Sequence, residues 1–187
     1  MTTRRDEGHA DESTRERILR HAIKRFSTQS YNTTGLREIA ADAGVDVAWV
    51  HRSFGSKEKL FAECVRASIA EESAFRDFGP QTFQRLLEKF VSTSDEPEPR
   101  SIDILIHSMT SPEASGIIRE LGDELVLAPL AKAAGPGREV KATVLLSAFF
   151  GIAIMRDIIG MKSLTDADPE EIRTLLAKFI EDAMGET

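Results

Sequence analysis

The chain has 187 residues, of which 41% are hydrophobic and 29% are charged, as is ordinary for a folded protein in water. This composition argues against a chain that is disordered along its whole length. The formal net charge of −7 argues, at first sight, against binding to nucleic acid.

The charge is divided unevenly along the chain. Residues 1–57 carry ten Lys and Arg against eight Asp and Glu, a net charge of +2. The rest of the chain carries 14 Lys and Arg against 23 Asp and Glu, a net charge of −9. The sign of this asymmetry is that of an N-terminal DNA-binding module on an acidic body.

The sequence also indicates a compartment. Cys64 is the only cysteine, so no internal disulfide can form, which suits a reducing cytoplasm. No apolar secretory segment is visible near the start. The longest uncharged stretch, 142–155, has 14 residues, fewer than the ~20 that cross a bilayer. We therefore expect a cytoplasmic protein with no membrane partner.

Short helices are expected in the N-terminal third. Residues 1–13 are polar and lack periodicity, which is typical of a mobile arm. Apolar residues at helical spacing, with polar caps before them, predict helices over 14–27, 35–43, 47–54 and 57–74. The expected N-caps are Ser13 or Thr14, Thr34, Asp46 and Ser56.

Helices are also expected through the rest of the chain. The predicted ranges are 81–91, 100–110, 113–132 with a break near Gly122 or Pro129, 139–159, and a last helix from 169. The last helix has the clearest start, because Asp168 can cap it and Pro169 occupies its first position. Residues 92–99 are expected to form a loop. No strand-like alternation occurs, so the fold class is all-α.

Residues 36–54 have the pattern of a helix-turn-helix. Ala40 is small where a second helix would cross, and Gly44 can take the left-handed turn position. The residues expected in the shared core are Ile39, Ala43, Val45 and Val50. An ordinary helical hairpin is the alternative. In a helix-turn-helix, the second helix enters the major groove of DNA.

Here the sequence resembles the N-terminal domain of TetR-type repressors. The resemblance rests on the run Thr34-x-x-x-x-Ile39-Ala40-x-x-Ala43-Gly44-Val45, then Phe54, and then Ser56-Lys57-Glu58-x-Leu60. It covers about residues 15–65. It implies a flexible arm over 1–13, a three-helix DNA-binding domain over 14–56, and a connector helix joined to a larger helical ligand-binding and dimerisation domain over 57–187.

The resemblance also implies which residues meet DNA. Thr34, with Thr33 beside it, is similar to the family's phosphate-contacting threonine, and Lys57 resembles its phosphate-anchoring lysine. Arg37 falls where some members read a guanine, for which its fork is suited. The full set expected at DNA is Thr33, Thr34, Arg37, Asp46, Val47, Ala48, Trp49, His51, Arg52 and Lys57.

The predicted recognition helix departs from the family pattern. His51 replaces a usual tyrosine, and Arg52 adds a charge that would seek phosphate or base. Trp49 stands where small polar residues are more usual, either at the rim of the core or against a thymine methyl or deoxyribose. Arg4 and Arg5 either enter a minor groove or belong to a solvated tail.

The helix over 139–159 is apolar almost all round, more than one domain can cover. With the apolar stripe of the last helix, this predicts a homodimer through the last two helices, as the resemblance also implies. A buried helix in a monomer is the alternative. The residues expected at the interface are Val144, Ala148, Gly151, Ile154, Leu176 and Phe179.

A pocket for an apolar small-molecule effector is expected inside the second domain. The candidate lining residues are Asp103, His107, Met109, Phe149, Phe150 and Met155, for which a structural hydrogen bond or plain core is the alternative. No cofactor or metal is expected, since one cysteine and four scattered histidines offer no metal motif.

Two other function classes compete with a ligand-released repressor of a palindromic operator. An enzyme is disfavoured because the chain shows no nucleophile elbow, phosphate loop or metal motif. A non-specific architectural DNA binder is disfavoured by the acidic body and the apolar C-terminal half. An activator differs from a repressor only in where its operator lies.

Overall fold

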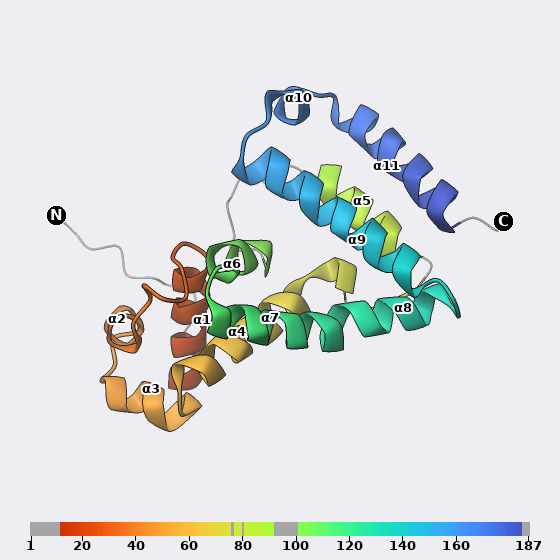
Figure 1. Cartoon of the computed structure of the whole chain (residues 1–187). Helices are drawn as coiled ribbons and strands as arrows, with labels where there is room; N and C mark the ends of the chain where they lie inside the picture. The colour runs from red at the N-terminus through yellow and green to blue at the C-terminus, as the bar shows by residue number, and fades with distance from the viewer. Residues whose placement is uncertain (1–11, 76, 80, 92–100, 185–187) are drawn as a thin grey trace. The chain divides into compact units, whose positions relative to one another are not determined.

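The computed structural model describes residues 12–75, 77–79, 81–91 and 101–184. Every regular element in these ranges is helical, which confirms the all-α prediction (Figure 1). Residues 1–11 of the expected arm, with Arg4 and Arg5, and the expected loop over 92–99 lie outside the described residues. None of the described helices is both long and apolar enough to span a membrane.

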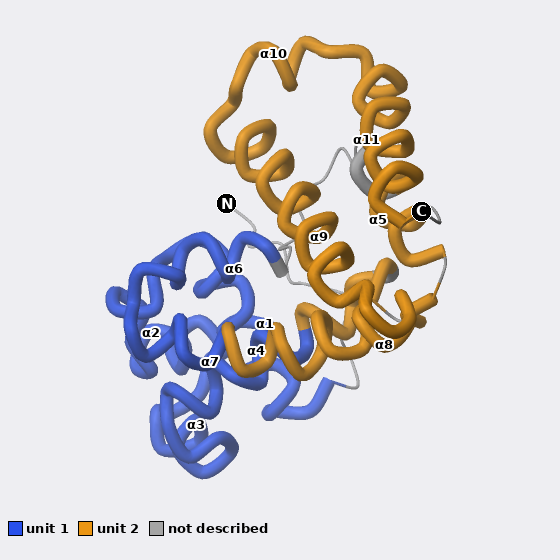
Figure 2. Tube along the Cα trace, turned by 45° about the vertical axis from the view of Figure 1, so that its right-hand side comes forward, with its two compact units in different colours: residues 1–67, 99–118 blue, residues 68–98, 119–187 orange. Residues whose placement is uncertain are grey.

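The chain forms two compact units (Figure 2). Unit 1 contains residues 1–67 and 99–118, and unit 2 contains residues 68–98 and 119–187. The division into functional ranges 1–13, 14–56 and 57–187 stays a prediction. The structure adds that residues 101–108, expected in the larger domain, pack with the N-terminal helices in unit 1.

Unit 1 is built around its first helix. Its elements are α1 (Thr14–Phe26), α2 (Leu36–Asp42), α3 (Val47–Phe54), the first part of α4 (Lys57–Glu71), α6 (Ser101–Ser108) and the first part of α7 (Pro112–Gly122). α1 packs against α2, α3 and α6. It begins at the predicted place with a capping box, in which Ser13 and Glu16 each accept a hydrogen bond from the other's backbone N–H.

The core of unit 1 joins the start of α4 to the three short helices. The rings of Phe26 and Tyr31 each meet the ring of Phe61 edge to face, with centroids 5.0 Å apart. Phe61 lies on α4, and all three rings are buried. The beginning of α4 is therefore part of the same packed body as α1.

Unit 2 surrounds a long apolar helix. Its elements are the end of α4, the 3₁₀ turn η1 (Ser73–Phe75), α5 (Thr82–Val91), the π-helical turn η2 (Asp123–Leu127), α8 (Ala128–Ala134), α9 (Glu139–Ala153), the π-helical turn η3 (Ile154–Ile158), α10 (Lys162–Thr165) and α11 (Pro169–Met184). α11 packs against α5 and α9, and α8 against α9 (Figure 1). The short helix α10 was not predicted.

The core of unit 2 takes one side of α9. Its buried members are Phe83, Leu87, Val126, Leu130, Ala142, Leu145, Leu146, Phe149, Ile172 and Leu176. The prediction that Leu176 lies at a dimer interface is therefore wrong, because this side chain is buried in the core of its own unit. The apolar stripe of α11 has two rows. Ile172 and Leu176 form the buried row, and Leu175 and Phe179 form the exposed row.

Candidate nucleic-acid interface

The turn between α2 and α3 depends on Gly44. α2 ends in a Schellman motif, because the Val45 N–H donates to the Ala40 carbonyl at 2.9 Å and the Gly44 N–H donates to the Ala41 carbonyl at 3.1 Å. Closing these two bonds puts Gly44 at φ +64°, which side-chain-bearing residues rarely adopt. The glycine thus ends α2 and lets the chain turn directly into α3.

α3 has one buried face and one open face. The Asp46 carboxylate accepts a hydrogen bond from the Ala48 N–H at 2.8 Å, so it caps the helix as predicted. Val50 and Phe54 are buried in unit 1, and Val47 is half-buried. The exposed residues of the helix are Ala48, Trp49, His51 and Arg52. A short helix with four neighbouring residues open to solvent can enter a groove.

Trp49 and Arg52 contact each other on this open face. The Trp49 side chain is 48% exposed, as the inward position of Val50 predicted. The Arg52 guanidinium carbon lies 4.3 Å from the centroid of the indole, which is a cation–π contact. The reading of Trp49 as a core-rim residue is therefore wrong, and the indole and the guanidinium form one exposed pair.

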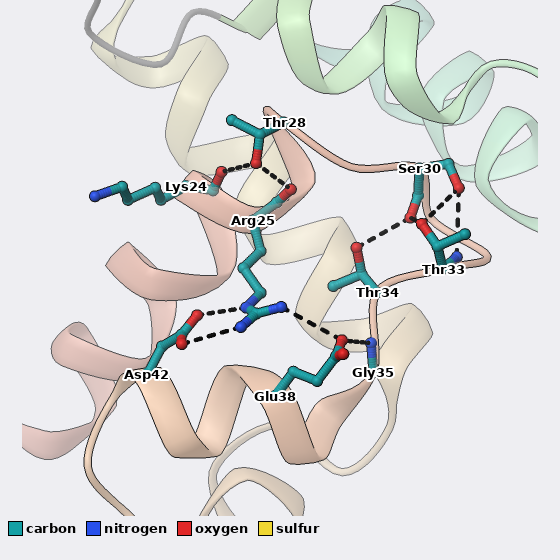
Figure 3. Close-up of polar contacts among 9 residues, drawn as sticks. All are labelled: Lys24, Arg25, Thr28, Ser30, Thr33, Thr34, Gly35, Glu38 and Asp42. Carbon is teal, nitrogen blue, oxygen red and sulfur yellow. Dashed lines mark hydrogen bonds and ion pairs between the residues drawn. The ribbon is translucent and has the colours of Figure 1, made fainter.

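Arg25 fixes α2 to the last turn of α1 (Figure 3). Its guanidinium donates two hydrogen bonds to Asp42, one of them at 3.0 Å, and lies 3.4 Å from a Glu38 carboxylate oxygen. Glu38 in turn accepts a hydrogen bond from the Gly35 N–H at 3.0 Å. The hydrogen bonds from Arg25 lower the pKa of Asp42. The start and the end of α2 are thus both fixed by one side chain.

The prediction that Thr34 caps α2 is wrong. The N-cap position belongs to Gly35, and the Thr34 hydroxyl instead donates to the Ser30 carbonyl at 3.0 Å (Figure 3). Thr34 is fully buried, so its side chain offers nothing to a phosphate in this conformation. Its neighbour Thr33 is exposed and shares a 2.9 Å hydrogen bond with the Ser30 hydroxyl. Of the two threonines, only Thr33 is placed to meet a ligand.

Lys57 lies against the protein at the start of α4. Its Nζ is 4.2 Å from the centroid of the buried Tyr31 ring. Burial lowers the pKa of the ammonium, against the opposing effect of the carboxylates of Glu58, Glu113 and Glu38. A phosphate contact through Lys57 stays a prediction. It would use the N–H groups that point away from the ring, or need the side chain to move.

The remaining residues expected at DNA differ in exposure and in the contacts that they already make within the chain. Arg37 is exposed on α2, and His51 is exposed on α3 with its Nδ1 3.4 Å from the Gly55 carbonyl. Asp46 is engaged in capping. The structure thus gathers Ala48, Trp49, His51 and Arg52 on one face of α3.

The candidate pocket residues do not belong to one unit. Asp103 is half-buried, and His107 and Met109 are exposed, in or just after α6 of unit 1. Phe149 and Phe150 lie on α9 of unit 2, where Phe149 is buried and its ring stacks on Phe83 with centroids 6.2 Å apart. Met155 is exposed in η3 of the same unit. The alternative of plain core is wrong for Met109, which is 51% exposed, and for Met155, and it holds for Phe149.

The expected interface residues occupy different positions in unit 2. Val144 and Phe179 are exposed apolar side chains, and Gly151 is also exposed. Ala148 and Ile154 are half-buried. A Cβ built on Gly151 meets no atom within 4 Å, so the chain itself leaves this position open.

Sequence reasoning missed three features of the candidate interface. These are the ion pairs of Arg25 with α2, the cation–π contact of Lys57 with Tyr31 and the cation–π contact of Arg52 with Trp49. The last of these contacts could have been predicted from the sequence, because residues three apart on a helix lie on the same face. The first two join segments whose proximity only the packed structure defines.

Two family models match the chain. Residues 18–64 match the model described as bacterial regulatory proteins, tetR family. Residues 81–183 match the model described as Tetracyclin repressor-like, C-terminal domain. The second match alone spans more than half of the chain. Among curated protein sequences, no significant match was found.

Solved structures of similar fold span nearly the whole chain. A TetR-family regulator from Streptomyces coelicolor A3 is 24% identical, with 92% of this chain and 95% of that chain covered and a TM-score of 0.57. GusR from Salmonella enterica is 18% identical, with 90% of this chain and 95% of that chain covered and a TM-score of 0.66. EbrR, a multidrug binding protein complexed with proflavin, is 19% identical, with 90% of this chain and 100% of that chain covered and a TM-score of 0.53.

The two family models together span both units, and the structural neighbours share the arrangement of helices. The chain therefore belongs to the TetR family of transcription regulators, with an N-terminal helix-turn-helix DNA-binding domain and a helical C-terminal ligand-binding domain.

Proposed function

We propose that the protein is a repressor that binds a palindromic operator as a homodimer and leaves it when an apolar small molecule binds. The observation that carries the DNA part is the open face of α3, with Trp49, His51 and Arg52 exposed on a helix whose opposite face is buried. A helix presented in this way suits the major groove, where base pairs can be distinguished.

The surface of unit 2 supports the homodimer. α9 carries Val140, Val144, Ser147 and Gly151 at spacings of four, three and four, and all four are exposed. At 100° per residue they share one side of the helix, opposite the buried Leu145 and Phe149. On α11, which packs against α9, the exposed Leu175 and Phe179 add further apolar surface to this unit. A second copy with the same surface is the partner that covers it.

The effector is proposed to be an apolar small molecule held in unit 2. Support comes from the match of residues 81–183 to the C-terminal family model. EbrR, which has a similar fold, was solved with the flat molecule proflavin. Phe150 and Met155 remain proposed contacts in this unit, and Asp103, His107 and Met109, which lie in unit 1, are not part of the proposed site. A tenfold release of DNA requires a ligand to favour the released state by only about 1.4 kcal/mol.

Selection of bound sequences from a pool of random duplexes tests the proposed function. The wild-type protein should enrich one palindrome, and its affinity for that palindrome should fall steeply as salt is raised, because phosphate contacts release counterions. A matched duplex with the palindrome scrambled should bind much more weakly at every salt concentration. A pool in which no palindrome is enriched would contradict the proposal.

A further inference from the structure

Among the described residues of unit 1, three contacts join a cation to an aromatic ring, and one of them differs from the others. Arg15 lies over Phe54 with its guanidinium carbon 4.6 Å from the ring centroid, and Lys57 lies over Tyr31. Phe54 and Tyr31 are core residues, so these two cations cover the edge of the core. In the Trp49–Arg52 contact, at 4.3 Å, both side chains are exposed on α3. Because neither side chain is part of the core, packing gives no reason for this pair.

We infer that Trp49 and Arg52 act as one reader, in which the indole holds the guanidinium in a fixed plane so that its fork donates to O6 and N7 of one guanine in each half-site. This inference rests on the proposed function. The contact with guanine is bidentate and lies in the plane of the base, so it requires the guanidinium plane to be set. An indole that sets this plane before binding reduces the freedom that Arg52 loses on the DNA.

The surroundings of Arg52 favour a base over a phosphate as its target. Among the described residues, no carboxylate forms an ion pair with Arg52. A phosphate presents oxygens in several directions, so a contact with it depends less on one fixed plane of the guanidinium, and a lysine can also make it through charge. Stacking on a ring restricts rotation without adding charge. That restriction is useful only for a contact that has a required orientation.

The test repeats the duplex selection with variants of the pair. Arg52→Lys keeps the charge but removes the fork, so it should lower the preference for one guanine per half-site by about tenfold. Trp49→Ala should lower the preference at the same position, although its side chain donates nothing to guanine O6 or N7. Trp49→Phe keeps an aromatic face and should retain most of that preference. The double variant should lose little more at that position than Arg52→Lys alone.

Arg37→Lys is the control, since Arg37 is an exposed arginine for which the described residues show no ring contact. Because Arg37 is itself expected at DNA, any preference that this variant loses should lie at another base pair, with the Arg52 guanine unchanged. The inference is overturned if Trp49→Ala leaves that guanine unchanged or alters only another position. It is also overturned if Arg52→Lys weakens all sequences alike. If the wild type enriches no palindrome, the proposed function fails first and the inference with it.

Discussion

Gly44 shows how a single residue decides the geometry of the DNA-binding unit. The two hydrogen bonds that end α2 require a positive φ at this residue, and α3 begins three residues later. The requirement is purely one of backbone conformation, because a Cβ built on Gly44 meets no atom within 4 Å. Gly116 is equally open in space but lies inside the helix α7. An added methyl group has room at both positions, so the two substitutions differ only in the backbone conformation that the new residue must adopt.

Replacing Gly44 by alanine should lower the free energy of unfolding by about 1–2 kcal/mol, because an L-residue in the left-handed region is strained by that amount. Gly116→Ala should have the opposite sign and stabilise the protein by up to about 1 kcal/mol, since alanine is the better helix former. Chemical denaturation of both variants measures the two effects. Equal stability of Gly44→Ala and the wild type would show that the turn does not require a glycine.

At the residue scale, what the sequence could predict follows from local rules. Gly44 and the exposure of Trp49 were predictable, because each follows from helical geometry around neighbours already assigned to the core. Thr34 was not, because its hydroxyl bonds to Ser30 in a loop that has no periodicity. Leu176 and Phe179 share one stripe, and the spacing of apolar residues cannot say which row faces inward.

At the scale of elements, α2 is held to α1 by charge as well as by apolar packing. Arg25 is mostly covered, whereas Asp42 and Glu38 are more open to solvent. Such a partly exposed network contributes about 1 kcal/mol or less to stability. Its value for function is orientation, because α2 leads through the Gly44 turn into α3.

Asp42→Asn should lower stability near neutral pH, and this loss should disappear in acid. The pKa of Asp42 is lowered in the folded protein, mainly by hydrogen bonds from Arg25. Its ionised form therefore adds stability above the unfolded pKa of about 4, and that stability is lost as the pH falls through the lower folded pKa. Urea denaturation at pH 7 and near pH 3 measures the difference.

Glu170→Gln is the matched control for this experiment. Glu170 pairs with Arg173 within the same helix, on the exposed side of α11. Removing this pair should change stability by only a few tenths of a kcal/mol, as is usual for exposed helical pairs, about 0.3–0.5 kcal/mol. A difference between wild type and Asp42→Asn that stays constant from pH 7 to pH 3 would show that the carboxylate charge of Asp42 is not what holds α2.

The starts of α3 and α11 were predictable from their capping aspartates, whereas the cap predicted for α2, Thr34, was wrong. α3 begins after Asp46 and α11 after Asp168, as predicted, and each aspartate accepts a hydrogen bond from the backbone two residues later. The four-residue helix α10 has no such signal and was missed. The packing of α6 on α1 was also missed, because periodicity shows which face is apolar and does not show which helix covers it.

At the scale of the whole molecule, binding to a palindrome requires two copies of the chain. One copy presents one α3, and a palindrome needs two at a fixed spacing, ~34 Å for successive major grooves. The exposed apolar side of α9 is the surface proposed to join them. Val144 on that side and Met109 in unit 1 are both 51% exposed, so the two residues form a matched pair for substitution.

The proposed dimer can be tested by sedimentation of the enriched palindromic duplex with wild-type, Val144→Glu and Met109→Glu proteins. The wild type should bind as two chains per duplex, and free protein should sediment as a dimer. Val144→Glu should leave the fold intact but give free monomers and lose the two-chain complex, because an unpaired charge buried in an apolar interface costs several kcal/mol. Met109→Glu should behave as the wild type does. A wild-type protein that remains a monomer and binds the palindrome as one chain would contradict the proposed homodimer.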